Sequence, residues 1–377
     1  MPKYKFLCVD DEEAVSSLVR TLNRHSTKFH IELEFPRPFP SAVQHIVQLD
    51  KAGEIDGLLL DLRLDQFVNE GNSRADYRAA ALAQEIRTLA TEKKISAFPI
   101  FLWSIDTKLS KSFRKDNSSQ DLFDLIVVKE AFPDEASSIA RRLASVAKAY
   151  KDIASSLKRS PHFKDLIKLN AKSVCFLDAR IGEEFANSPK SFPVHSYANY
   201  IFNYMIETPG PLIDEAILCA RLGVDSNKSP QLPKLLEIIE ESTAYRGPFS
   251  DEWRRWWWPL VHRWWSRLQT DMKPMMSLPA SSRVALLQKL LNLKGLAVAK
   301  PIADGYGQFF STVCRGLNKP LDPMDGFVIA SSSKALPWQD KSYLSREAAL
   351  NRFKYNVRLE LDPIEKERLQ SFKAQNR

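Results

Sequence analysis

The chain has 377 residues, of which 44% are hydrophobic and 27% are charged, a composition typical of a folded globular protein. This length exceeds the size at which one hydrophobic core usually stops growing, so it favours two domains. No apolar run approaches the roughly 20 residues that a membrane-spanning helix needs. The N-terminal residues also contain no apolar stretch long enough for a secretory signal. We therefore expect a cytoplasmic protein without contact to a membrane.

Cysteine spacing and charge narrow the class of protein further. The four cysteines, Cys8, Cys175, Cys219 and Cys314, are far apart, which is typical of neither a disulfide framework nor a structural zinc site. Residues 1–150 contain 21 Lys and Arg against 22 Asp and Glu, whereas the remaining residues contain 33 against 24 and carry a net charge of +9. A basic C-terminal part can contact nucleic acid or an acidic protein surface, so the charge also predicts two units with different partners.

Residues 1–150 alternate between short β-rich runs and helical patterns. This order builds a parallel sheet with helices on both faces. The wholly apolar run Gly57–Leu60 is typical of a strand that is buried on both faces. The sequence therefore predicts a doubly wound α/β domain with a five-stranded parallel sheet. The expected strands are Tyr4–Val9, Phe29–Phe35, Gly57–Leu60, Pro99–Trp103 and Leu125–Val128, and the expected helices are about Glu12–His25, Ser41–Leu49, Ala79–Glu92 and Glu135 onward.

Charged and hydroxyl side chains follow these strands at their carboxyl ends. Asp10 and Asp11 follow the first strand, Asp61 the third, Ser104 the fourth and Lys129 the fifth. In a doubly wound fold such strand ends converge on one crevice. Neighbouring carboxylates repel one another unless a cation lies between them, and oxygen ligands favour Mg²⁺ or Mn²⁺. Such a cation would keep Asp61 ionised and shield an incoming phosphoryl group, whose oxygens could then bind Ser104 and Lys129.

This set of residues resembles the receiver domain of bacterial two-component response regulators, which has the chemotaxis-regulator-like fold. The resemblance covers about 40% of the chain, in the stretches Phe6-Leu-Cys-Val-Asp-Asp-Glu12, Leu58-Leu-Leu-Asp-Leu-Arg-Leu64, Pro99-Ile-Phe-Leu-Trp-Ser104 and Ile126-Val-Val-Lys129. It implies that a histidine kinase phosphorylates Asp61. The only reaction that the chain itself is expected to catalyse is its own dephosphorylation. It also implies that Asp10, Asp11, Asp61 and the main-chain carbonyl of Arg63 hold Mg²⁺, and that Ser104 and Lys129 transmit the switch.

Three positions depart from the receiver pattern. Ile105 stands where a small residue is usual, Glu130 where a proline is usual, and Ile126 where an aromatic residue is usual. The branched side chain of Ile105 could crowd the phosphoryl pocket. An alternative interpretation is therefore a pseudo-receiver scaffold that never accepts phosphate and acts through protein contacts, for example in a bacterial phage-defence system.

The helical pattern continues from Glu135 to about Leu157 and carries a heptad-type stripe. This stripe fits either a last helix that covers the receiver sheet or a signalling helix that pairs with a second copy in a homodimer. Ser160-Pro161 ends the pattern, so we place a receiver-like domain at residues 1–157 and an output domain at residues 160–377. The stripe consists of Ile139, Leu143, Val146, Tyr150, Ile153 and Leu157.

The output domain is predicted to be mainly helical, with few strand-like runs. Residues 212–239 loosely resemble a helix-turn-helix, whose second helix would enter a DNA major groove. Together with the basic charge, this resemblance leaves a DNA-binding transcriptional regulator as a second alternative. The expected helices are Tyr197–Glu207, Leu212–Leu222, Gln231–Ser242 and Ser282–Leu293.

Six of the eight tryptophans lie in residues 251–268, interleaved with arginines. Several of them share one helical stripe if the helix restarts at Pro259. Such a segment can stack on nucleic-acid bases, form a protein interface or build an aromatic core, so the output partner is a protein or DNA. No phosphate-binding loop, dinucleotide fingerprint or nucleophile elbow predicts a catalytic output domain. The candidate contact residues are Trp253, Arg254, Arg255, Trp257, Arg263, Trp264 and Arg267.

Overall fold

The computed structural model of the protein forms two compact units, and the chain passes between them repeatedly. The first unit contains Met1–Leu166, Glu184–Phe202 and Gly247–Glu252, and the second contains Ile167–Glu183, Asn203–Arg246 and Trp253–Arg377. Two segments from beyond residue 166 thus fold as part of the first unit. The structure describes residues 4–12, 14–66, 75–105, 121–160, 162–169, 171–186, 192–268 and 273–375.

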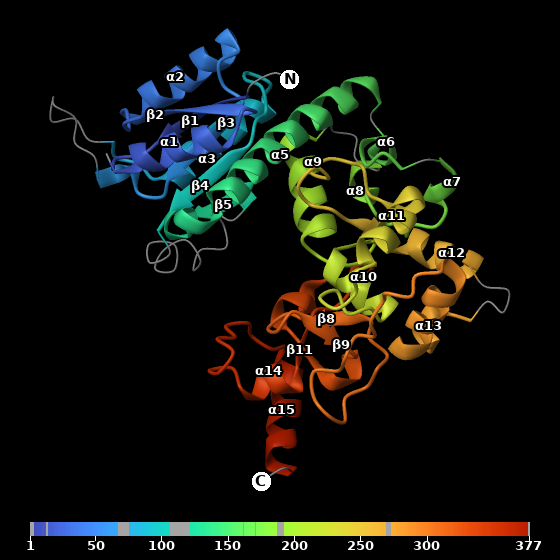
Figure 1. Cartoon of the computed structure of the whole chain (residues 1–377). Helices are drawn as coiled ribbons and strands as arrows, with labels where there is room; N and C mark the ends of the chain where they lie inside the picture. Colours follow the sequence, from blue (N-terminus) through green and yellow to red (C-terminus); the bar gives the residue numbers. More distant parts are fainter. Residues whose placement is uncertain are drawn as a thin grey trace. The chain divides into compact units, whose positions relative to one another are not determined.

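Five parallel strands form the sheet of the first unit (Figure 1). They pair in the order β2-β1-β3-β4-β5, which is a doubly wound order with a crossover on each side of β1. The central strands β3 and β4 are buried at every residue, as expected when helices cover both faces. The predicted α/β class is confirmed. The strands are β1 (Tyr4–Val9), β2 (Phe29–Glu34), β3 (Gly57–Asp61), β4 (Ile100–Ser104) and β5 (Leu125–Val128).

Helices cover both faces of this sheet, and side chains alternate between the two faces because the period of a strand is two residues. On one face Leu58 and Leu60 pack with Ile46 of α2 and Leu82 of α3. On the other face α1 packs against α5. The helices are α1 (Val15–His25), α2 (Phe39–Ala52), α3 (Ala79–Thr91) and α5 (Phe132–Arg159), close to the predicted ranges.

Helix α5 is enclosed by its own chain. It has 28 residues, which corresponds to about 42 Å at 1.5 Å per residue. The predicted stripe is buried from Ile139 to Ile153, and Leu157 is half-buried. α5 packs against α1, α6 (Phe163–Leu166) and α9 (Val194–Asn199). Because these helices cover the stripe, the structure supports a sheet-covering helix rather than one whose stripe is available to a second copy.

The second unit is mainly helical, as predicted. Helix α10 is the central one, since its residues from Ile217 to Leu222 are all buried. The Asp214 carboxylate caps its N-terminus by accepting from Ile217 N at 2.8 Å, and Gly223 ends it at φ 77°. The helices are α7 (Ala171–Val174), α10 (Glu215–Leu222), α11 (Leu232–Thr243), α12 (Trp258–Leu268), α13 (Ala280–Leu291), α14 (Arg346–Leu350) and α15 (Pro363–Gln375).

Three local differences from the predicted pattern occur beyond residue 160. The expected helix Tyr197–Glu207 is instead α9 followed by a π-helical segment, Tyr200–Ile206. The expected helix Leu212–Leu222 starts later than predicted, because Leu212–Ile213 form the short strand β6. Strand β6 pairs with β7 (Trp256–Trp257). A four-stranded sheet of order β10-β11-β8-β9 was not predicted, because three-residue strands are too short to show alternation. Its strands are β8 (Thr312–Cys314), β9 (Lys319–Leu321), β10 (Gly326–Val328) and β11 (Tyr343–Ser345).

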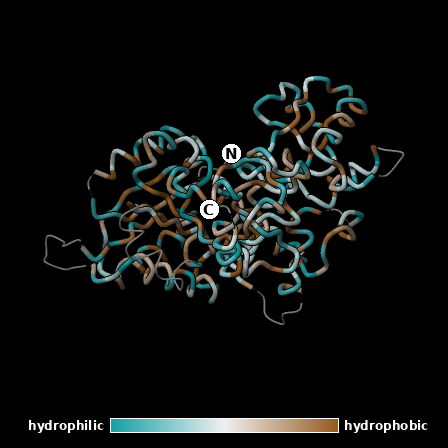
Figure 2. The backbone as a smooth tube through the Cα atoms, turned by 90° about the horizontal axis from the view of Figure 1, so that it is seen from below, coloured by the Kyte–Doolittle hydropathy of each residue, from teal (hydrophilic) through white to brown (hydrophobic). Residues whose placement is uncertain are grey.

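Hydrophobic stretches are distributed along the whole backbone rather than gathered in one long segment (Figure 2). In the described part of the chain, no helix combines the length and the apolar character needed to cross a membrane.

Candidate functional site

Four of the predicted site residues come together at the carboxyl edge of the first sheet. Asp10 directly follows β1, Asp61 and Ser104 are the last residues of β3 and β4, and Lys129 directly follows β5. The register of the ladder places Asp61 opposite Trp103, next to Ser104 on the neighbouring strand. Parallel strands deliver their carboxyl ends to the same edge, so residues up to 119 positions apart in the sequence meet there.

Lys129 bridges the two buried carboxylates of this site. Its Nζ atom lies 2.7 Å from Oδ2 of Asp10 and 2.9 Å from Oδ1 of Asp61. Both aspartate side chains are fully buried, and the Lys129 side chain is 6% exposed. Charges interact strongly where water is excluded, so one shared ammonium offsets the repulsion between the two carboxylates. Glu12, whose Oε2 lies 3.8 Å from Nζ, adds an acid that the sequence analysis did not single out.

Backbone amides fix the second oxygen of each carboxylate. Arg63 N donates to Oδ2 of Asp61 at 2.8 Å, and Glu12 N donates to Oδ1 of Asp10 at 3.0 Å. The Arg63 guanidinium forms an ion pair with Asp65 instead, and its Nε donates to Oδ1 of Asp65 at 2.7 Å. Arg63 therefore contributes to this site through its backbone amide.

Burial and the shared ion bridge set the protonation of the site. Burial raises the pKa of Asp10 above its ordinary value, although contact with the Lys129 ammonium opposes this shift. Burial acts to lower the pKa of Lys129, but Asp61 and Asp10 together outweigh burial and raise it. Lys129 therefore stays positively charged at neutral pH.

The hydroxyl of Ser104 is fully buried and makes no hydrogen bond to any group in the described part of the chain. A buried polar atom without a partner costs free energy and is rare in native proteins unless function retains it. The preceding residue, Trp103, packs edge-on against Phe132 at 5.2 Å, and Lys129 Nζ lies 5.9 Å from its ring centroid. The Ser104 hydroxyl is thus a buried hydrogen-bond donor on the strand next to Asp61.

The positions that depart from the receiver pattern lie around this site. Ile105 is half-buried and Glu130 is exposed. Ile126 is 41% exposed and lines a shallow hollow of about 220 Å³ with Ile139 and Arg142 of α5. Ile126 therefore faces a groove between β5 and α5 instead of packing inside the sheet.

The expected Mg²⁺ ligands match the ion in chemistry. Asp10, Asp11 and Asp61 offer carboxylate oxygens, the donors that Mg²⁺ prefers, and Asp11 is half-buried directly after Asp10. Among the described residues, no group of three or more Asp, Glu, His or Cys side chains is arranged to hold one metal ion. In this arrangement the Lys129 ammonium supplies the positive charge between Asp10 and Asp61.

The tryptophan-rich segment is largely part of the core of the second unit. Trp253 and Trp257 are 8% and 2% exposed, and Trp264 is half-buried against the core cluster. A single stripe does not form, because residues 256–257 make β7 and α12 starts only at Trp258, with Pro259 in its first turn. The base-stacking interpretation of Trp253 and Trp257 is therefore wrong, since their rings are not accessible.

Most arginines of the same segment are occupied within the protein. Arg254 lies over the Trp256 ring at 4.9 Å and pairs with Glu240 and Glu215. Arg255 Nε donates to the Ile206 carbonyl at 3.0 Å. Arg263 lies over the Phe176 ring at 4.3 Å, and Arg267 is exposed. These cation–π and ion-pair contacts favour a structural role for Arg254 and Arg263.

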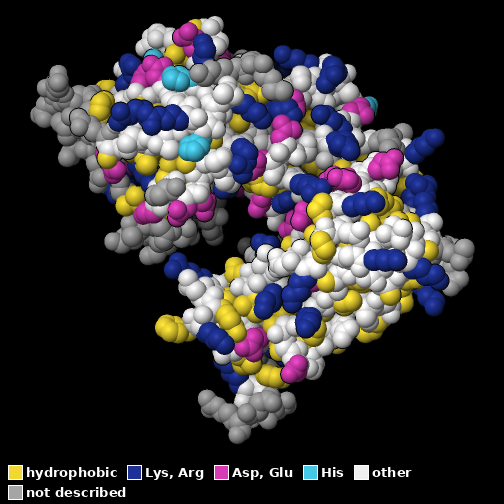
Figure 3. Space-filling view, viewed as in Figure 1, with side chains coloured by type: hydrophobic (Ala, Val, Ile, Leu, Met, Phe, Trp, Pro, Cys, Tyr) yellow, Lys and Arg dark blue, Asp and Glu magenta, His cyan; other side chains and the backbone are white. Residues whose placement is uncertain are grey.

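The segment that loosely resembles a helix-turn-helix does not present a DNA-reading face. α10 is buried in the core, and α11 exposes Lys234, Glu237 and Glu241 on its outer side. Two acids on that side would oppose the phosphate backbone. On the face of the molecule in Figure 3, Lys and Arg side chains are scattered among other residues.

A second polar network, missed by the sequence analysis, lies at the opposite edge of the sheet. Arg87 of α3 donates to Oδ2 of Asp124 at 2.7 Å, and the Tyr150 hydroxyl donates to Oδ1 of Asp124 at 2.5 Å. His195 of α9 lies 3.0 Å from that hydroxyl through Nδ1. Burial, followed by the charge of Arg87, lowers the pKa of His195 to about 4. The network anchors α9 to the receiver-like sheet.

Comparisons with known proteins give only distant likenesses. No family model matches the chain, and no curated protein matches it. It is similar to a structure of the Salmonella typhimurium RcsB response regulator described by its conformational dynamism for DNA interaction, with 13% identity and a TM-score of 0.23 over 54% of this chain and 92% of that chain. It is also similar to RcsB from Salmonella enterica serovar Typhimurium bound to promoter rprA with the phosphomimetic BeF3−, with 14% identity and a TM-score of 0.24 over 52% of this chain and 98% of that chain. Because these TM-scores are low, the two likenesses carry no argument. The evidence for a receiver-like fold is the strand order and the residues at the strand ends.

Proposed function

We propose that the chain is a response-regulator-like signalling protein whose receiver-like domain, residues 1–157, accepts a phosphoryl group on Asp61 from a histidine kinase. The observation that carries this proposal is the convergence of Asp61, Lys129 and the Ser104 hydroxyl, which has no hydrogen-bond partner among the described residues, at one edge of the sheet. An acid alone would be a common strand-end residue, whereas an acid with both a cation and a spare hydroxyl donor matches what a bound phosphoryl group needs.

The chain's own residues have distinct roles in this transfer. An oxygen of Asp61 attacks phosphorus, the bond from phosphorus to the donor's histidine nitrogen breaks, and an acyl phosphate forms. Arg63 N, which donates to Oδ2 of Asp61 at 2.8 Å, orients the carboxylate. The Ser104 hydroxyl then donates to a phosphoryl oxygen, and the Lys129 ammonium exchanges its contact with Asp61 for the more negative phosphoryl group. Asp10, Asp11, Asp61 and the Arg63 carbonyl would hold Mg²⁺ once Lys129 moves from between the carboxylates, and the ion would then supply further charge neutralisation.

The output of this switch is a contact with another macromolecule. When Ser104 and Lys129 shift towards the phosphoryl group, the ends of β4 and β5 change the surface that they present. A protein partner is favoured over DNA for the C-terminal region, because Trp253 and Trp257 are buried and the outer side of α11 is acidic.

Intact-protein mass spectrometry tests the proposal. The full chain is incubated with Mg²⁺ and a small phosphodonor such as acetyl phosphate, and we expect it to gain the mass of one phosphoryl group. The Asp61→Asn variant should not gain this mass, whereas the matched control Asp65→Asn, which alters a nearby acid paired with Arg63, should still gain it. An unchanged mass for the wild-type chain, or equal labelling of Asp61→Asn, would contradict the proposal.

One observation favours a second candidate, the pseudo-receiver scaffold. Lys129 already neutralises Asp10 and Asp61, and Asp61 has no exposed surface. On this alternative the ion bridge is a permanent structural element and signalling occurs through protein contact alone. A wild-type chain that stays unmodified, while Lys129→Met lowers its stability, would select the scaffold.

A further inference from the structure

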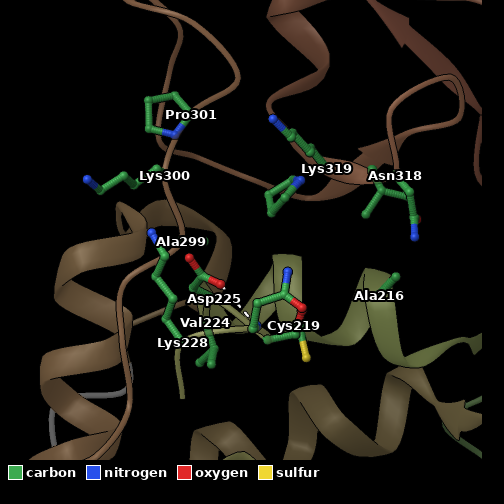
Figure 4. A pocket seen from close by; sticks show the side chains of 14 residues that line it. Ala216, Cys219, Val224, Asp225, Lys228, Ala299, Lys300, Pro301, Asn318 and Lys319 are labelled. Carbon is green, nitrogen blue, oxygen red and sulfur yellow. Dashed lines mark hydrogen bonds between the residues drawn. The ribbon is translucent and has the colours of Figure 1, made fainter. Parts of the chain in front are cut away.

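A basic hollow lies in the second unit. Its volume is about 530 Å³. Three separate segments line it, namely α10 with the loop that follows, residues 299–301, and the hairpin of β8 and β9. Each segment contributes one lysine: Lys228, Lys300 and Lys319 (Figure 4). Because these lysines are far apart in the sequence, only the fold brings them together.

The charge of this hollow is not balanced by its own residues. Within the described residues, none of Lys228, Lys300 and Lys319 forms an ion pair with an acid, although 21 ion pairs of other Lys and Arg side chains occur in this part of the chain. Asp225 is the one acid among the lining residues, and its Oδ1 accepts from the backbone amide of Asn227 at 3.0 Å. Three ammonium groups against one carboxylate leave a net positive potential, which is focused in a concave site.

The walls of the hollow are held in place by backbone hydrogen bonds. Val224 forms an antiparallel bridge with Val298, Asp225 N donates to the Ala297 carbonyl at 2.9 Å, and Ala299 N donates to the Gly223 carbonyl at 2.8 Å. The opposite wall is the antiparallel ladder between β8 and β9. A site with fixed walls loses little conformational entropy when a ligand binds.

We propose that this hollow binds a phosphorylated small molecule of nucleotide size. Lysine ammonium groups bind phosphate as point charges, and two or more phosphates would match the surplus of positive charge. The remaining lining includes the apolar side chains of Val224, Val313 and Pro301, which suit an organic moiety rather than a free inorganic anion. Ligand pockets typically enclose about 300–1,000 Å³, and the volume of this hollow lies within that range.

The proposal does not depend on phosphorylation of Asp61, since no residue is shared between the two sites. It also commits to a small molecule rather than to a nucleic-acid strand. The three exposed lysines line one hollow, whereas the exposed side of helix α11 carries Glu237 and Glu241, which would repel an extended phosphate backbone.

Equilibrium binding to the full chain tests the proposal. Calorimetric titrations with ATP, adenosine and inorganic tripolyphosphate are carried out without added metal, and duplex DNA is titrated separately. We expect ATP to bind more tightly than adenosine or tripolyphosphate, because ATP alone engages both the lysines and the apolar lining. The variant Lys228→Gln/Lys300→Gln/Lys319→Gln should weaken ATP binding about tenfold or more.

A matched variant controls for total charge. Lys234→Gln/Lys289→Gln/Lys294→Gln removes three exposed lysines of the same unit that do not line the hollow, and its ATP affinity should equal that of the wild type. Melting curves without ligand check that both triple variants are folded. The proposal is overturned if ATP does not bind at millimolar concentration, if both triple variants weaken binding equally, or if duplex DNA binds and ATP does not displace it.

Discussion

Replacing Lys129 by Met gives the sharpest test of the strand-end site. The substitution keeps most of the side-chain volume but removes the ammonium that lies 2.7 Å from Asp10 and 2.9 Å from Asp61. Both carboxylates are fully buried, so they would be left without their shared counter-ion. Removing one partner of a buried ion pair typically costs about 3–5 kcal/mol, and we expect a loss of at least about 3 kcal/mol in the stability of the sheet.

The predicted loss depends on pH, and its sign follows from the pKa shifts. Burial raises the pKa of Asp10, and the Lys129 ammonium limits this rise. Without the ammonium the folded-state pKa rises further above the unfolded value, so the folded variant takes up protons more readily than the unfolded chain. Protonation then relieves the buried repulsion. The stability of Lys129→Met relative to wild type should therefore increase as the pH falls from 7 towards 5.

Amide hydrogen exchange, followed by mass spectrometry, measures this loss of local stability. A loss of 3 kcal/mol corresponds to about 140-fold faster exchange, at about 1.4 kcal/mol for each factor of ten, in peptides that contain β1 and β3. The control is Lys94→Met, which removes a lysine paired with Glu92 at a side-chain exposure of 65%, where solvent screening leaves an ion pair little effect on stability. Unchanged protection of β1 and β3 in Lys129→Met at pH 7, or a loss that does not diminish at pH 5, would refute the reasoning.

The other predictions concern the second network and a helix end. Tyr150→Phe removes the hydroxyl that donates to Asp124 at 2.5 Å and accepts from Arg87 at 3.2 Å, which should cost about 1–3 kcal/mol, seen as a lower melting temperature. His195, with a pKa of about 4, is expected to remain neutral in an NMR titration from pH 8 to 5. Its depressed pKa also predicts that stability falls as the pH drops from 6.5 to 4, because the unfolded state binds the proton first, and His195→Gln should flatten this dependence. Gly223→Ala should lower the urea midpoint by more than Gly53→Ala does. Both glycines have positive φ, but only at Gly223 would the added Cβ lie 2.7 Å from a backbone atom, Cα of Ala280; equal midpoints for the two variants would contradict this.

The local sequence determined the elements of the first unit and the membership of the strand-end site. Short β-rich runs, such as the apolar Gly57–Leu60, alternate with helical patterns, and both signals depend only on neighbouring residues. The general rule that parallel strands end at one edge then places Asp10, Asp61, Ser104 and Lys129 together without further information. Which residues meet at the site was predictable, because strand direction alone brings them to one edge of the sheet.

Tertiary packing decided how those groups are used and what the rest of the chain does. The position of the Lys129 ammonium between two carboxylates depends on distances of 2.7 and 2.9 Å, which no spacing in the sequence encodes. The burial of Trp257, the return of α9 to cover α5, and the meeting of Lys228, Lys300 and Lys319 around one hollow are contacts between distant segments. The periodicity of a sequence shows which side of a helix or strand is apolar, but it does not show which other element packs against that side.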